Sequence, residues 1–157
     1  MGKTKGKRRR SLLASGLFGG MALVGVLLTS CDVETSDNGH LDGFWQLRAA
    51  DTLATGGHSD LTGLSLTWAF QGRLLELRDL HGQRTDIVSS FSHEGNTLRL
   101  FDACIVDRDK GDIRIEEPTE LSPYGVNRID ESFTVEQLDA SKMVLKSDRL
   151  RLTFRKY

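Results

Sequence analysis

Apolar and polar residues alternate one by one along most of the chain after residue 42, which is the period of a strand with one buried face. The alternation is cleanest near residue 150, where Leu150, Leu152 and Phe154 are separated by an arginine and a threonine. Each such run has one face that a core can bury. Together the runs predict about eight strands, near 43–50, 64–71, 73–80, 86–93, 96–104, 131–138, 142–147 and 149–156.

Short turn signals such as Gln71-Gly72 and Glu94-Gly95-Asn96 separate most of the predicted strands. Connections this short join antiparallel neighbours, since a parallel crossover needs a dozen residues or more. The pattern therefore predicts an all-β fold with a single antiparallel up-and-down sheet. Closure into a barrel is favoured over a two-sheet sandwich because closure removes the sheet edges. Two stretches interrupt the pattern: a Gly- and Thr-rich loop at 51–63, and 105–130, where an acidic turn precedes a helical or turn segment around 118–127.

The first thirty residues have the composition of an export signal. Six basic residues precede an apolar stretch from Leu12 to Leu28, and no acidic residue is present. The next residues, Leu28-Thr29-Ser30-Cys31, match the lipobox of bacterial lipoproteins, in which the cysteine is acylated and the peptide before it is removed. An uncleaved membrane helix is the alternative, although the stretch is short for one and contains four glycines.

The lipobox divides the chain into three expected parts. Residues 1–30 form a lipoprotein signal peptide, 31–41 hold the acylated Cys31 and a flexible acidic tether, and 42–157 form the folded domain. The expected location is the cell envelope, lipid-anchored to the outer membrane through Cys31, on either its periplasmic or its surface face.

Removal of the signal leaves an acidic protein. Residues 31–157 contain 15 of the 21 basic and all 22 acidic residues, a net formal charge of −7. Such a field repels nucleic acid, so nucleic acid is excluded as a partner. With Cys31 acylated, Cys104 is the one remaining thiol, and the domain must be stable without an intrachain disulfide. We expect a monomer with a single core.

Gly43-Phe44-Trp45, at the start of the first predicted strand, resembles the G-x-W signature of lipocalins. The segments 91–96 and 141–156 are similar to a family of small lipocalin-like lipoproteins of Bacteroides-type bacteria, and the resemblance extends over most of 42–157. It implies a small antiparallel barrel behind a lipobox, and it implies no established activity.

The resemblance also suggests how one end of the barrel is closed. In lipocalins the signature tryptophan closes the narrow end, and an arginine of the last strand lies across its ring, which implies these roles for Trp45 and Arg155. This domain is shorter than full lipocalins and lacks their long helix, which leaves the size of any interior cavity open.

Four aromatic residues are expected to line the barrel interior: Trp68, Phe70, Phe91 and, from the loop side, Tyr124. An eight-stranded barrel is just wide enough either to be filled by its own side chains or to hold one small ligand. The first hypothesis is therefore a non-enzymatic protein that binds a small hydrophobic ligand at these four residues. The alternative is a structural or interaction module with a filled barrel, which binds an envelope protein or a glycan, or acts as an inhibitor.

The polar residues do not form a recognisable catalytic or metal motif. The acidic turn from Asp107 to Asp112 departs from a calcium loop, because Pro118 stands where the bidentate glutamate belongs. Ser92-His93-Glu94 contains residue types found in catalytic triads. Consecutive strand residues point to opposite faces, so these side chains cannot form a chain of nucleophile, base and orienting group. Cys104 is expected to be a small buried residue. The sequence thus predicts no enzyme, no metal and no cofactor.

Overall fold

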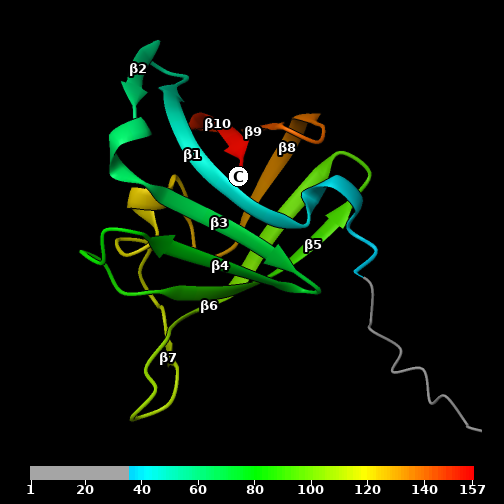
Figure 1. The fold of residues 1–157 in the computed structure, drawn as a ribbon. Helices are drawn as coiled ribbons and strands as arrows, with labels where there is room; N and C mark the ends of the chain where they lie inside the picture. The colour runs from blue at the N-terminus through cyan, green and yellow to red at the C-terminus, as the bar shows by residue number, and fades with distance from the viewer. Residues whose placement is uncertain (1–35) are drawn as a thin grey trace, which may run out of the picture. The chain divides into compact units, whose positions relative to one another are not determined.

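Eight antiparallel strands close into a barrel in the computed structural model, which describes residues 36–157 (Figure 1). They follow one another around the barrel in chain order, and the last strand pairs with the first. The strands are β1 (Gly43–Thr52), β3 (Leu66–Gln71), β4 (Leu74–Asp79), β5 (Ile87–Glu94), β6 (Thr97–Ile105), β8 (Glu131–Leu138), β9 (Lys142–Lys146) and β10 (Leu150–Lys156). The predicted all-β up-and-down barrel is confirmed.

Two short strands extend the sheet beyond the barrel. The second half of β1 pairs with β2 (Gly57–Asp60), whereas its first half pairs with β3. β7 (Ile113–Arg114) pairs with the end of β6 and lies on a loop that projects from the barrel (Figure 1). The stretch 51–63, expected to be a loop, therefore contains a strand and also the 3-10 turn η2 (Thr62–Leu64). Alternation did not reveal β2 because all four of its residues are exposed.

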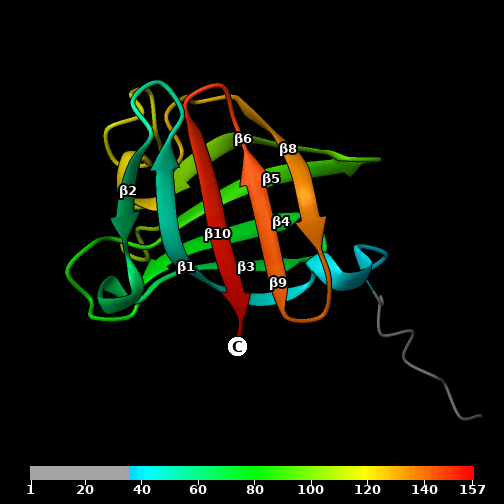
Figure 2. The ribbon, with the colours of Figure 1, turned by 90° about the horizontal axis from the view of Figure 1, so that it is seen from above.

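Each end of the barrel is covered by a 3-10 turn. The end at which β1 begins carries η1 (Gly39–Leu41), and we call it the η1 end. The opposite end, where β1 finishes, is covered by the segment 118–126 with η3 (Ser122–Tyr124), and we call it the η3 end. The helical or turn segment predicted around 118–127 is thus a turn. Figure 2 shows β10 and β9 running between the two ends.

The prediction of a flexible tether is wrong for residues 36–41. Leu41 is fully buried in the core, and Asn38 donates a side-chain hydrogen bond of 2.8 Å to the carbonyl of Gly72 in the β3–β4 turn. Residues 36–41 therefore belong to the folded domain, because one apolar side chain and one turn bond are enough to fix so short a segment. Cys31 and the signal 1–30 lie outside the described residues.

Side chains alternate between the two faces of every barrel strand. On β10, Leu152 and Phe154 are buried, whereas Arg151 and Arg155 are exposed. One core fills the barrel and also includes residues of both covering turns, Leu41 and Tyr124 among them. Within residues 36–157, no helix has the length and apolar character needed to span a membrane.

Candidate functional site: the barrel interior and its two ends

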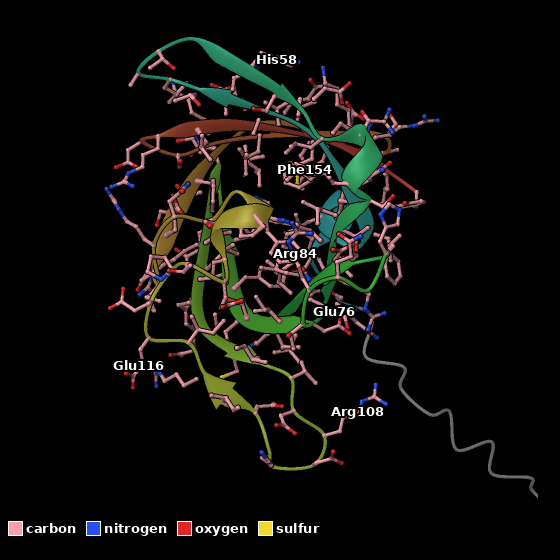
Figure 3. All side chains as sticks on the ribbon, turned by 90° about the vertical axis from the view of Figure 1, so that its left-hand side faces the viewer. His58, Glu76, Arg84, Arg108, Glu116 and Phe154 are labelled. Atoms are coloured by element: carbon pink, nitrogen blue, oxygen red, sulfur yellow. The ribbon has the colours of Figure 1, made fainter. Side chains whose placement is uncertain are left out.

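Aromatic side chains from four strands meet inside the barrel. The Trp68 ring lies 4.9 Å from Phe154, 5.9 Å from Phe133 and 6.1 Å from Phe70, measured between ring centroids. Phe70 in turn packs edge-on against Phe91 at 5.0 Å. Figure 3 shows Phe154 inside the barrel. Tilted and edge-on contacts at these distances are the favourable geometries for aromatic pairs.

The structure brings the four predicted ligand-binding residues together, but it packs them against one another. The indole nitrogen of Trp68 donates a 3.2 Å hydrogen bond to the carbonyl of Tyr124. Trp68 and Tyr124 are fully buried, Phe70 is 2% exposed and Phe91 is 5% exposed. Their mutual contacts make these residues part of the core and give the barrel a filled interior at this level.

Phe133 and Phe154 complete this cluster, although the sequence analysis did not include them among the interior aromatics. Both lie on strands whose alternation was recognised. Phe154 shares a face with Leu152, and Phe133 shares a face with the half-buried Val135. The alternation could have identified them, since every aromatic residue on the buried face of a closed barrel points to the same interior.

The η1 end is closed by Trp45. Its indole nitrogen donates a 2.7 Å hydrogen bond to the carbonyl of Leu41 in η1, and the side chain is fully buried. The cation over its ring is Lys156, whose ammonium nitrogen lies 4.9 Å from the ring centroid and also donates to the carbonyl of His40 at 2.8 Å.

The expected pairing of Arg155 with Trp45 is wrong, because Arg155 is exposed on the outer face of β10. Phe154 points inward, and a strand turns each successive side chain to the other face. Lys156 therefore returns to the inner face, directly opposite Trp45 in the strand pairing. Arg155 has the positive charge that such a contact needs, but its position in the strand turns its side chain to the outer face.

Replacing Lys156 by alanine should lower the free energy of unfolding by about 1 kcal/mol, because the ammonium group loses both the ring contact and the carbonyl. The matched change Arg155→Ala should alter it by less than about 0.5 kcal/mol, since this side chain is exposed. Urea unfolding followed by circular dichroism measures both values. A larger cost for the arginine variant would restore the pairing that the resemblance implies.

The η3 end carries polar groups at the edge of the core. The Tyr124 hydroxyl is buried, and no hydrogen-bond partner reaches it from the described residues. Burial, reinforced by the nearby Asp79 carboxylate, raises the pKa of this phenol to about 12. The Asp79 side chain is itself buried and accepts a 2.7 Å bond from Arg84, which reaches inward at the rim (Figure 3). The backbone N–H of His81 and Arg84 together hold the pKa of Asp79 below its ordinary value, although burial opposes them.

Glu131 is a second buried carboxyl near the η3 end. One oxygen accepts the backbone N–H groups of Asn127 at 2.5 Å and Arg128 at 3.2 Å, and the other oxygen has no partner among the described residues. Burial raises the pKa of this group more than the two N–H donors and the nearby Ser147 hydroxyl lower it. Glu131 thus fixes the chain between η3 and β8.

Replacing Glu131 by glutamine should stabilise the fold near pH 7 and have little effect near pH 4. As the pH rises, the unfolded chain loses this proton before the folded chain does, so the wild-type residue disfavours folding increasingly up to its raised pKa. Glutamine keeps an oxygen for both N–H donors and cannot ionise. Unfolding free energies at the two pH values measure the effect, with the exposed Glu117→Gln as the control. An equal difference at both pH values would contradict the raised pKa.

Two open hollows lie on the outer surface, on either side of the β3–β4 turn. The larger has a volume of about 640 Å³, and its lining is mostly apolar: Ser36, Asp42, Gly43, Phe44, Ala69, Phe70, Gln71, Leu74, Glu76 and Val88. The other, of about 510 Å³, is more polar and includes Asn38, Arg73, His93 and Glu94. Neither hollow was expected from the sequence, because each is made by side chains from separate strands.

The acidic turn forms its own hydrogen bonds. The Asp107 carboxylate accepts the backbone N–H of Asp109 at 2.9 Å and of Lys110 at 3.0 Å, which is the geometry of an Asx turn. No group of three or more His, Cys, Asp or Glu residues within 36–157 is placed to hold a metal. Cys104 is a free thiol and is half-buried, where burial was expected.

Comparison with known proteins identifies the class. A family model described as a lipocalin-like domain matches residues 26–157, so the chain belongs to the family of lipocalin-like domain proteins. This confirms the resemblance drawn from Gly43-Phe44-Trp45 and the segment 141–156.

The search of solved structures found two proteins from Bacteroides, and the first of them shows a similar fold. A lipocalin-like protein from Bacteroides uniformis is 21% identical, with 76% of this chain and 100% of that chain covered at a TM-score of 0.58. An uncharacterized protein from Bacteroides eggerthii is 18% identical, with 74% and 98% covered at a TM-score of 0.49. No curated protein matches the sequence.

Proposed function

We propose that this lipocalin-like protein is a non-enzymatic, lipid-anchored envelope protein whose barrel is a solid scaffold for interactions with an envelope protein or a glycan. The observation that supports this most is the contact of Trp68 with Phe70, Phe133 and Phe154, none of which is more than 2% exposed. Ligand pockets are usually formed in advance, and here the corresponding space is occupied by side chains.

The surface at the η3 end supports the same function. Leu64 and Leu80 are 42% and 51% exposed, and their segments are joined by a 3.2 Å hydrogen bond from the Leu80 N–H to the Ser65 carbonyl. Exposed apolar side chains on loops around a rigid barrel are typical of a binding surface. The η3 end is also the end opposite to η1, at which the described chain begins.

The anchor itself rests on the lipobox and is tested by Cys31→Ser. The wild-type chain, expressed in a host that acylates lipoproteins, should remain with membranes after a high-salt wash, whereas the variant should be released, because an acylated cysteine binds by burying its methylene groups. Cys104→Ser is the matched control and should stay with membranes. Retention of Cys31→Ser would contradict the anchor and favour an uncleaved helix.

Binding of a small hydrophobic ligand inside the barrel is the second candidate function. The observation in its favour is the buried Tyr124 hydroxyl, which has no partner among residues 36–157. A ligand with one polar group could satisfy this hydroxyl if the 118–126 segment moved away from the mouth. The lipocalin-like fold is compatible with this function as well.

One experiment separates the two candidates. Native mass spectrometry of the protein extracted from its own envelope should show the acylated polypeptide alone if the barrel is filled. An apolar dye should bind without saturation to the wild type, whereas Phe91→Ala should bind it stoichiometrically, because truncation opens an apolar cavity. A co-purified small molecule, or saturable dye binding to the wild type, would favour the ligand-binding function instead.

A further inference from the structure

Exposed apolar side chains gather beside the point where the described chain begins. Phe44 is 54% and Leu74 is 53% exposed, and both line the 640 Å³ groove, to which Ser36 also contributes. Phe44 lies on β1 next to Trp45 but faces outward, and its carbonyl accepts the backbone N–H of Tyr157, a side chain that is 69% exposed. Three of the large exposed apolar residues of the domain are thus at the η1 end.

The length of chain between Cys31 and Ser36 identifies what this groove can meet. Four residues lie between the two positions, and five fully extended residue steps span about 18 Å. An acyl group on Cys31 would therefore keep the groove within about 18 Å of the bilayer at all times. So short a link gives the bilayer a high effective concentration near the groove. An apolar groove that is too weak to bind a membrane by itself can then bind the membrane to which the chain is attached.

The charge of the groove indicates which lipid surface it fits. Its charged lining residues are Asp42 and Glu76. Glu76 accepts a 2.6 Å bond from Arg78, so the negative charge at the groove comes from Asp42 and from the net charge of −7 of residues 31–157. Anionic headgroups would be repelled by this field, whereas zwitterionic headgroups are not.

We infer that the groove formed by Phe44, Ala69, Leu74 and Val88 docks on the zwitterionic surface of the membrane that holds the Cys31 anchor. This inference rests on the proposed anchor and adds an orientation to it. The η1 end faces the bilayer, and the η3 end with Leu64 and Leu80 faces away from it. The short tether and the apolar groove act together, since the acyl chain supplies the attachment and the groove restricts rotation of the domain.

The test uses the full acylated chain with an environment-sensitive dye on a single cysteine. Leu74→Cys places the dye in the groove, and Leu80→Cys is the matched control, because it is 51% exposed and lies at the other end of β4. Both variants carry Cys104→Ser. Iodide quenching is measured in vesicles of phosphatidylethanolamine and phosphatidylcholine and, for the same variants with Cys31→Ser, in solution. Attachment should reduce quenching at position 74 by about threefold or more and leave position 80 within about 1.5-fold.

A second pair of variants shows whether the groove itself makes the contact. Phe44→Ser should restore most of the quenching at position 74, whereas Ile113→Ser, a change of similar exposed apolar area on β7, should not. With acrylamide as an uncharged quencher, because anionic vesicles repel iodide by themselves, vesicles containing phosphatidylglycerol should shield position 74 less than zwitterionic vesicles do.

Each other outcome overturns the inference. Quenching that is unchanged at both positions, or reduced equally at both, shows that the domain has no preferred face toward the bilayer. If mass spectrometry finds acyl groups on Cys31 while iodide still quenches the dye at position 74, the lipid anchor is supported and only the docking of the groove is contradicted. If it finds no acylation, the anchor and the docking fail together.

Discussion

Replacing Trp68 by alanine should lower the free energy of unfolding by about 4–5 kcal/mol, the upper part of the range for a large buried aromatic residue. The ring is fully buried, contacts three phenylalanines and donates its indole N–H to the Tyr124 carbonyl. Strands around a closed barrel cannot move together to fill the space, so most of the cavity should persist. Guanidinium unfolding followed by circular dichroism measures the loss.

The control for this prediction keeps an aromatic ring at position 68, smaller than the indole, and removes the N–H donor. Trp68→Phe should cost clearly less than the alanine variant, because it leaves one apolar ring in the cluster and one unpaired carbonyl at Tyr124. A loss below about 2 kcal/mol for Trp68→Ala would mean that the interior is loosely packed, and would favour a ligand cavity over a filled core.

Replacing Trp45 by alanine should lower the free energy of unfolding by about 3–5 kcal/mol. The change empties the η1 end: it removes a fully buried ring, its hydrogen bond to the Leu41 carbonyl and the surface on which the Lys156 ammonium rests. Loss of the ring should also loosen η1, which should appear as faster hydrogen exchange at the backbone N–H of Leu41.

The residue next to Trp45 supplies a matched control. Phe44 is on the same strand and is aromatic, but 54% of it is exposed, so Phe44→Ala should change the unfolding free energy by less than about 0.5 kcal/mol. The contrast between neighbouring residues tests the alternation directly. Similar costs at both positions would contradict the assignment of Trp45 to the inside and Phe44 to the outside.

Taken together, the two tryptophan variants test the proposed function as well as the fold. A barrel that is filled from Trp45 at the η1 end to Tyr124 at the η3 end should be sensitive to truncation of either tryptophan, and the two are cross-strand partners on β1 and β3. A ligand-binding barrel should be sensitive at Trp45 and tolerant at Trp68, because pocket-lining side chains make fewer contacts with the protein. The ratio of the two losses therefore separates the candidates independently of mass spectrometry.

The segment 118–126 shows where sequence reasoning reaches its limit. Its turn character follows from Pro118 and Pro123, but its place over the barrel mouth does not. Gly125 has a φ of +86°, and a Cβ added there would meet the buried Leu152 side chain at 2.7 Å. That contact joins positions far apart in the chain, and no local pattern encodes it.

Lys156 and the outer groove differ in what the sequence could show. The alternation places Phe154 with Leu150 and Leu152 on one buried face, so it already puts Lys156 on the inner face and Arg155 on the outer face, against the pairing that the resemblance implies. The groove needed Phe44 from β1, Leu74 from β4 and Val88 from β5 to lie side by side on one outer face.

The sequence by itself determined the eight barrel strands, their antiparallel order and the inward side of most of them, because alternation and short turns are local properties of the chain. The tertiary structure alone decided that Trp68, Phe70 and Phe91 fill the interior, that Tyr124 covers the η3 end and that residues 36–41 join the core. These outcomes depend on the width of the closed barrel relative to the volume of its side chains. The width of the barrel is defined only when all eight strands have paired and the sheet has closed.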